Sequence, residues 1–272
     1  MSLLKLTFII LIPIVLSGCF ENKNNTDKLC QNYPELNCQR LNTNDGQCRL
    51  PRTDLIWHKY ETQKEPTDAN RIKEYKLMTL YRKCLANASQ IQTFDSSSRA
   101  EKRVDALLFS GEEQQRLIED LKVSATPETL YFLWSQLGDE DAKRTFLFME
   151  NTKALETPEM QYNLATIYVQ KNTDKTLALL HRALELSKDG NVNPEIFQSL
   201  ASIHYRQKDK EKAYIWAKIA EGYEVSVVSG KELQLLYGFK QNKYDKLDEI
   251  ADKLESAIDS GKYRSQMMPN TF

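Results

Sequence analysis

The sequence predicts an all-α protein, and two observations support this prediction. Only nine glycines and eight prolines occur in 272 residues, whereas strand-rich and doubly wound folds usually need such residues at many turns. From residue 67 onward, apolar residues recur at helical spacing behind several helix-start signals. The 41% hydrophobic content is enough for a sizeable core, and the formal net charge of -1 gives no electrostatic reason to expect nucleic acid as a partner.

Residues 1–18 have the pattern of a signal peptide. Lys5 precedes an apolar stretch, residues 6–16, that is too short to span a bilayer comfortably. The stretch closes on Leu16-Ser17-Gly18-Cys19, which resembles the bacterial lipobox. We therefore expect Cys19 to be lipidated and to become the mature N-terminus. The alternative is an ordinary secretory signal with a chance cysteine at its end.

Residues 19–28 are polar and predict a short tether that holds the folded part off the lipid surface. Phe20 stands where an aspartate would resemble an inner-membrane retention signal, and this favours the outer membrane. We expect a lipid-anchored protein of the bacterial cell envelope that faces the periplasm. Acyl chains, rather than basic residues, would supply the attachment to the membrane.

The cysteines that remain after Cys19 predict two disulfides, because their number is even and the compartment is oxidising. Three pairings of Cys30, Cys38, Cys48 and Cys84 are possible. Cys30 and Cys38 lie close enough in the sequence to close a local loop. We favour a Cys30 to Cys38 bridge and a Cys48 to Cys84 bridge, the second of which would staple the loop-rich segment 29–66 onto the first long helix.

Residues 67–125 predict a group of N-terminal helices. The first helix is expected over residues 67–91, the second over 98–109 and the third over 111–123. Ser110 and Glu113 have the spacing of a capping box, in which each side chain would satisfy a free backbone amide at the start of the third helix.

Residues 126–225 contain three similar helix starts. Each places a capping side chain before a proline and an acid: Thr126-Pro127-Glu128, Thr157-Pro158-Glu159 and Asn193-Pro194-Glu195. A leucine follows each proline by six residues, at Leu133, Leu164 and Leu200. A second helix is expected in each unit, and the clearest has its apolar stripe at Ala213, Trp216, Ala217 and Ala220.

Residues 226–272 are expected to form C-terminal capping helices and a tail. Ser229 has the chemistry of an N-cap for a short helix, and residues 243–258 carry an apolar face at Leu247, Ile250, Ala251, Leu254 and Ile258. The absence of a linker-like composition predicts one continuous helical array from about residue 67 to residue 258.

The recurring helix pairs resemble tetratricopeptide repeats, and the string SLASIHYRQKDKEKAYIWAKIAEGYEV at residues 199–225 is similar to the Sel-type variant. The resemblance implies a helical repeat solenoid with a disulfide-stapled N-terminal segment. The lipobox together with the runs at residues 45–60, 81–92 and 130–139 is also similar to a family of lipoproteins from marine gammaproteobacteria with no assigned function. This second resemblance implies the envelope setting and carries no activity.

The sequence offers no motif of enzyme chemistry. It lacks a glycine-rich phosphate loop, a paired-histidine metal helix, a nucleophile elbow and a dinucleotide fingerprint, so we expect no cofactor, no metal and no catalytic residue. His204 takes the apolar place that Tyr168 fills in the preceding repeat, which favours packing over catalysis. His181 is expected to be a partly exposed helical residue, and His58 a candidate for a surface site.

These observations favour a non-catalytic, lipid-anchored scaffold that binds an envelope protein or peptide through the concave face of its repeats. In the repeat register, the residues expected on that face are Glu159, Tyr162, Thr166, Gln170, Glu195, Gln198, Ser202, Tyr205 and Arg206. One alternative is a lipoprotein that binds peptidoglycan or another glycan on its aromatic residues. A third reading, an envelope hydrolase, has no recognisable residue constellation behind it.

The lipid anchor yields a direct prediction. Replacing Cys19 by alanine should abolish lipidation, because no other thiol stands at the processing junction and the tether carries no basic patch to hold the chain on the membrane. Metabolic labelling with a fatty acid checks this. Uptake of label by the variant, together with its sedimentation with membranes, would contradict the lipoprotein assignment.

Overall fold

A computed structural model describes residues 25–91, 97–188, 190–225 and 230–269. All regular elements in these residues are helices, so the predicted all-α class is confirmed. The signal peptide, Cys19 and Ser229 lie outside the described residues. Contacts divide the chain into two compact units, the first made of residues 1–66 and 74–113 and the second of residues 67–73 and 114–272.

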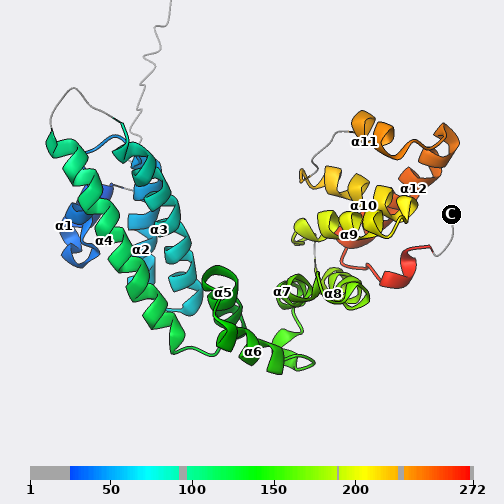
Figure 1. Ribbon diagram of the computed structural model, residues 1–272, viewed down its shortest axis with the longest axis horizontal. Coiled ribbons are helices and arrows are strands. Elements are labelled where there is room, and N and C mark those ends of the chain that lie inside the picture. Colours follow the sequence, from blue (N-terminus) through cyan, green and yellow to red (C-terminus); the bar gives the residue numbers. More distant parts are fainter. Residues whose placement is uncertain (1–24, 92–96, 189, 226–229, 270–272) are drawn as a thin grey trace, which may run out of the picture. The chain divides into compact units, whose positions relative to one another are not determined.

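The first unit contains short N-terminal helices and longer helices whose labels are shown in Figure 1. The elements that contribute to it are α1 (Thr26–Asn32), η1 (Pro34–Leu36), η2 (Cys38–Leu41), α2 (Arg49–Lys64), α3 (Asp68–Ser89) and α4 (Ser97–Lys122). Helix α1 begins inside the predicted tether, because the Asn25 side chain accepts a hydrogen bond from the Lys28 amide and caps it. Helix α2 occupies 16 residues of the segment predicted to be loop-rich.

The two disulfides join Cys30 to Cys38 and Cys48 to Cys84, so the favoured pairing is confirmed. Cys48 is the residue that precedes α2, and Cys84 lies in α3. The second bridge therefore ties the beginning of α2 to the C-terminal part of the next helix.

A buried ion pair adds a further tie within the first unit. The Arg103 Nε atom lies 2.6 Å from Asp45 Oδ2, and both side chains are buried. Arg103 also donates to the Ala88 carbonyl at 2.7 Å, while Arg52 donates to the carbonyls of Asn42 and Asp45. These contacts connect residues of the cysteine segment to α3 and α4. They explain why the structure groups residues 74–113 with that segment, in place of the predicted boundary at residue 66.

Helix α4 runs without a break from Ser97 to Lys122, so the predicted division at Ser110 is wrong. The Ser110 hydroxyl does not cap a new helix. It donates to the Ala106 carbonyl at 2.7 Å, one turn back along the same helix. A serine in a helix interior commonly satisfies its hydroxyl in this way, and the sequence pattern of a capping box cannot distinguish the two arrangements.

The second unit contains helices that pack as consecutive pairs (Figure 1). The elements are α5 (Pro127–Leu137), α6 (Glu140–Phe148), η3 (Lys153–Leu155), α7 (Pro158–Tyr168), α8 (Thr173–Leu186), α9 (Glu195–Arg206), α10 (Lys210–Gly222), α11 (Gly230–Tyr237), α12 (Gln241–Asp259) and η4 (Ser265–Met267). Helix α5 packs on α6, α7 on α8, and α9 on α10.

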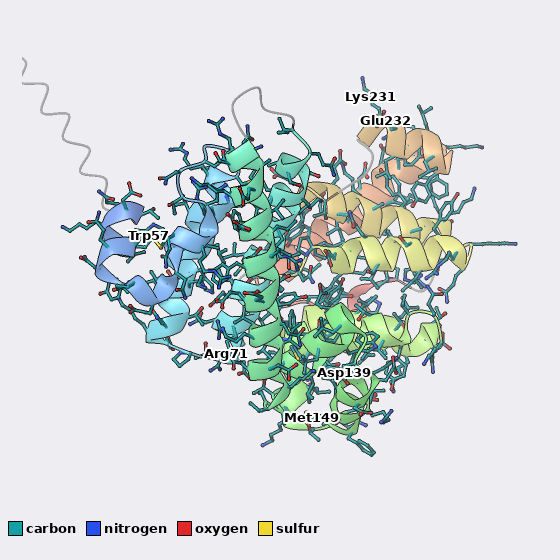
Figure 2. The ribbon with its side chains drawn as sticks, turned by 60° about the vertical axis from the view of Figure 1, so that its left-hand side comes forward. Trp57, Arg71, Asp139, Met149, Lys231 and Glu232 are labelled. Atoms are coloured by element: carbon teal, nitrogen blue, oxygen red, sulfur yellow. A yellow bond between two sulfur atoms is a disulfide. The ribbon has the colours of Figure 1, made fainter. Side chains whose placement is uncertain are left out.

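Side-chain caps begin most of these helices. Thr126 and Thr157 accept from the backbone amides of Thr129 and Met160, which confirms the first two predicted helix starts. At the third start, Pro194 is itself the cap position and Asn193 accepts from the Glu195 amide. Second helices are capped by acids and amides as well, including Asp139 at the start of α6, which Figure 2 labels together with Met149 at its end.

The core of the second unit is apolar and aromatic. Trp216 is fully buried and lies parallel to the Phe197 ring at a centroid distance of 6.2 Å. The predicted stripe of α10 and the predicted face of α12 join this core, with Ile250 and Ala217 only partly buried at its edge. The α5–α6 pair matches the predicted register less well than the α9–α10 pair. Leu137 of α5 is exposed, whereas His204, at the equivalent position of α9, is buried.

No helix in the described part of the chain is both long and apolar enough to cross a membrane.

Removing the Cys48–Cys84 bridge should destabilise the first unit more than removing the Cys30–Cys38 bridge. The bridged cysteines are 36 and 8 residues apart respectively. Loop entropy then gives costs of about 4 and about 2.5 kcal/mol. Amide hydrogen exchange of each cysteine-pair-to-serine variant measures the loss. Equal losses, or a larger loss for the short loop, would contradict the entropic explanation.

Candidate functional site

A groove of about 820 Å³ lies along α9 in the second unit. Six of the nine residues predicted for the binding face line it: Tyr162, Glu195, Gln198, Ser202, Tyr205 and Arg206. The remainder of the lining comes from α9 itself, from α10 and α11 and from Val169. The repeat register therefore identifies one wall of a real depression in the protein surface.

The division of α9 into two faces explains why these side chains are available. Ile196, Phe197, Leu200 and Ile203 are buried in the core, and they recur at the spacing of a single helical face. Other residues of the helix, such as Ser202 and Tyr205, must then project from the opposite side. The apolar face holds the helix, and its other face is left to form the groove.

Helix α11 supplies a wall that the sequence interpretation missed. Its Leu233, Leu236 and Tyr237 line the groove, and Leu236 is 54% exposed. The Tyr237 ring meets the Tyr205 ring edge-on at a centroid distance of 6.1 Å. This contact fixes the orientation of the partly exposed Tyr205 side chain. The run of leucines in ELQLLYGF at 232–239 was the available signal, since it contains more apolar residues than one buried face requires.

The first turn of α11 carries charged residues that do not belong to the groove. Lys231 and Glu232 are exposed, and Figure 2 shows their side chains pointing away from the helices. Leu233, Leu236 and Tyr237 of α11 therefore line the groove, while Lys231, Glu232 and the exposed Leu235 lie outside it.

One end of the groove is organised by a hydrogen bond. The Tyr162 hydroxyl donates to Glu195 Oε2 at 2.7 Å. Burial, and then the adjacent Glu195 carboxylate, raise the pKa of Tyr162 above its ordinary value. The phenol consequently stays protonated and keeps donating, which holds the carboxylate in place at the start of α9.

Three predicted residues do not line the groove. Glu159 and Gln170 are exposed elsewhere, and Thr166 is partly buried with its hydroxyl 2.9 Å from that of Tyr131. The depression is formed around α9, and α7 contributes only Tyr162 to its lining. The repeat pattern alone could not show this, because it treats equivalent positions in successive repeats as alike.

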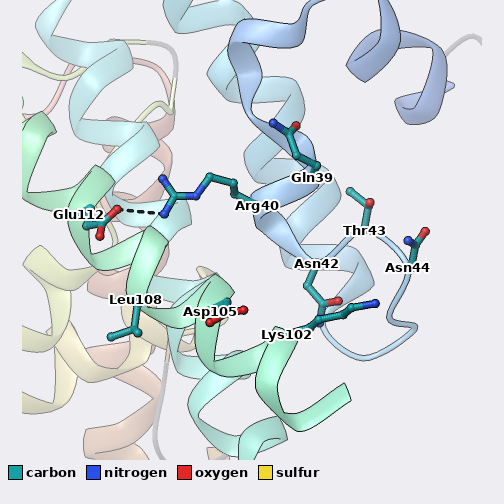
Figure 3. A pocket seen from close by; sticks show the side chains of 9 residues that line it. All are labelled: Gln39, Arg40, Asn42, Thr43, Asn44, Lys102, Asp105, Leu108 and Glu112. Atoms are coloured by element: carbon teal, nitrogen blue, oxygen red, sulfur yellow. Dashed lines mark hydrogen bonds and ion pairs between the residues drawn. The ribbon is translucent and has the colours of Figure 1, made fainter. Parts of the chain in front are cut away.

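The first unit has a separate, polar recess of about 580 Å³, shown in Figure 3. Two of its charged side chains form an ion pair: the Arg40 guanidinium lies 3.3 Å from Glu112 and stacks 4.0 Å above the Phe109 ring. Lys102 and Asp105 also line the recess, with Leu108 as an apolar contributor. These charges are of mixed sign and point to no single ligand chemistry.

None of the three histidines lines the groove. His58, predicted for a surface site, is instead buried, with Nδ1 2.8 Å from Glu61 Oε2. His204 is buried as the packing interpretation predicts, and neither of its ring nitrogens has a hydrogen-bond partner among the described residues. His181 is hydrogen-bonded to the Tyr263 hydroxyl at 2.7 Å. Within the described ranges no group of histidine, cysteine and acidic side chains could hold a metal ion.

Comparison with known proteins gives one match. A family model described as "Protein of unknown function (DUF2989)" matches residues 16–218. This range is more than half of the chain and contains α9 and the Tyr162–Glu195 pair, while α11 lies beyond it. No curated protein and no solved structure matches the chain.

Two histidines of the second unit, the partly buried His181 and the buried His204, predict that this unit loses stability in mild acid. Burial, then the neighbouring His204, lower the pKa of His181 to about 4, with Glu185 opposing and Lys212 reinforcing the shift. Burial also lowers the pKa of His204. In the unfolded chain each histidine has the higher pKa, near 6.5, so the unfolded chain binds more protons than the folded one. The free energy of unfolding is therefore highest above about pH 6.5 and falls as the pH drops toward 4.

For His181 alone the loss between about pH 7.5 and about pH 5 should be about 2 kcal/mol. Urea unfolding at the two pH values, compared between the wild type and His181→Gln, isolates the contribution of His181 to this loss. The variant should show a correspondingly flatter pH dependence. Parallel profiles for the two proteins would mean that His181 does not titrate across this range on unfolding.

Proposed function

This chain belongs to the family described as "Protein of unknown function (DUF2989)", and we propose that it is a lipid-anchored, non-catalytic scaffold of the bacterial envelope. In this proposal the groove along α9 binds a segment of another envelope protein. Acylated Cys19 localises the chain, and the groove recognises the partner.

The lipid anchor is supported by the sequence. A single lysine, a short apolar stretch and Leu16-Ser17-Gly18-Cys19 follow one another in the order that lipoprotein processing requires. The acyl chains provide the membrane attachment. The tether keeps the folded part at the periplasmic face of the membrane, which we propose to be the outer membrane.

The helix pairs of the second unit are proposed to be tetratricopeptide-like or Sel-like repeats. Three observations support this: the pairing of successive helices, the threonine caps before Pro127 and Pro158, and the buried leucine six residues after each of three prolines. Repeats of this kind stack so that first helices line one side of the array, which is where α9 contributes to the groove.

The observation that carries the binding function is the exposed apolar and aromatic surface in the groove. Leu236 and Tyr205 are each at least half exposed although they lie beside a well-packed core. Grooves that combine aromatic and arginine side chains with apolar walls are typical of sites where a few residues supply most of the binding energy. Neither His181 nor His204 lines the groove, so the site supports binding rather than acid–base chemistry.

Replacing Tyr205 and Arg206 together by alanine should release the partner without unfolding the protein. Both side chains are exposed and neither belongs to the buried face of α9. Each lost hot spot should cost about 2 kcal/mol of binding. Co-purification from crosslinked envelopes measures binding, and circular dichroism measures folding.

A chemically matched control is available on α6, where Arg144 and Phe148 are both exposed and lie outside the groove. Replacing this pair by alanine should leave the co-purified protein unchanged. If both double variants, or neither, lost the partner, the groove would not be the binding site. Retention of the chain on protein-free cell wall that depends on Tyr205 would instead identify a glycan ligand.

A further inference from the structure

Two formal charges occur among the described residues that line the groove, and they lie at opposite ends of α9. Glu195 is in the first turn and Arg206 in the last turn. We propose that the groove selects an extended peptide segment with a cationic side chain at one end and an anionic side chain at the other. This inference rests on the proposed function and specifies the chemistry of the partner.

The separation of the two charges sets the length of the segment. Glu195 and Arg206 are 11 residues apart on one helix, which corresponds to about 16 Å at 1.5 Å per residue. An extended chain advances about 3.3 Å per residue, so about five residues span that distance. We take the bound segment to be extended, because a few residues in that form already span the distance between the two charges.

The charged groups at both ends are available to a partner. Glu195 Oε2 accepts from Tyr162, which leaves the other carboxylate oxygen for an incoming ammonium or guanidinium. Arg206 is exposed, and among the described residues its guanidinium has no hydrogen-bond or ion-pair partner. An arginine fork of this kind binds a carboxylate with two parallel hydrogen bonds.

Among the described lining residues, the surface between the two ends carries no formal charge and is mostly apolar, with Gln198, Ser199 and Ser202 as its polar residues on α9. Ala201 on α9 and Ala217 on α10 line it, with Leu236 at the side. Alanines allow a peptide backbone to approach closely, and leucine contacts an apolar side chain. The middle of the bound segment is therefore expected to be uncharged and mostly apolar.

Glu195 and Arg206 also have a local effect, because an acid at the start of a helix and a base at its end each stabilise the helix dipole. Reversing either charge would thus weaken α9 slightly, whatever it binds. A loss of binding alone cannot separate the two roles. A change in the preferred partner does separate them, because destabilising the helix would lower the affinity for all partners alike.

The test uses four peptide libraries with acetylated and amidated ends: Lys-x4-Glu, Glu-x4-Lys, Lys-x4-Lys and Glu-x4-Glu, where x is a mixture of uncharged residues. Binding to the detergent-purified full chain is measured by fluorescence polarisation. The wild type should prefer a mixed-charge library, in one order or both, by about tenfold over the two like-charge libraries.

Single charge reversals should then change the preference. Arg206→Glu makes both ends acidic and should select Lys-x4-Lys, while Glu195→Arg makes both ends basic and should select Glu-x4-Glu. A mixed-charge library with a single residue between the charges serves as the spacing control. The wild type should bind it less tightly than the best of the four libraries.

The outcomes separate the two proposals. If all three proteins share the same library preference, the charge assignment is overturned while groove binding stands. If no library binds the wild type more tightly than a Ser202→Trp variant, in which an exposed groove residue is replaced by a bulky one, the groove does not bind peptide segments and the proposed function itself fails.

Discussion

The packing of Phe197 against Trp216 is the interaction on which the candidate site depends. It fixes the rotation of α9, because Phe197 and its neighbours Ile196, Leu200 and Ile203 are all held in the core. Once that face is buried, the opposite face must be exposed. The C-terminal tail reinforces this arrangement, since the fully buried Tyr263 contacts both Trp216 and His181.

Helix α11 converts an exposed helix face into a groove. Its Leu233 and Tyr237 are buried against the same core, and Tyr237 and Tyr214 meet edge-on. The adjacent Leu236 is left on the surface, although withdrawing a leucine side chain from water would stabilise the protein by roughly 2 kcal/mol. Leu236 therefore joins Tyr205 in an exposed apolar part of the groove, which is the kind of surface at which partners bind.

Much of the architecture could be predicted from local chemistry. Caps such as Thr126 act within one turn, and the cysteine pairing follows partly from short sequence separation, so both were accessible without a fold. The Ser110 capping box failed because its residues can satisfy their hydrogen bonds equally well inside a helix. The grouping of residues 74–113 with the cysteine segment was not accessible from the sequence, because Arg103 and Asp45 are 58 residues apart and nothing in the sequence shows that they meet.

For the site, helical register was enough to place residues of α9 on one face. It was not enough to find α11, because the position of that wall depends on how a helix not adjacent in sequence to α9 packs. Nor could it exclude Thr166 from the groove lining, because the hydrogen bond between Thr166 and Tyr131 cannot be seen in the sequence. Register describes a single helix, whereas a groove is a property of several.

The most direct test of the central claim, that the groove along α9 holds a segment of another protein, is photocrosslinking in living envelopes. A benzophenone side chain replaces Leu236 at the groove, and Phe148 on α6 in a control. The account predicts a discrete adduct with one envelope protein from position 236 alone, mapped by mass spectrometry to a short segment of that protein. The same adducts from both positions, or none from position 236, would contradict it.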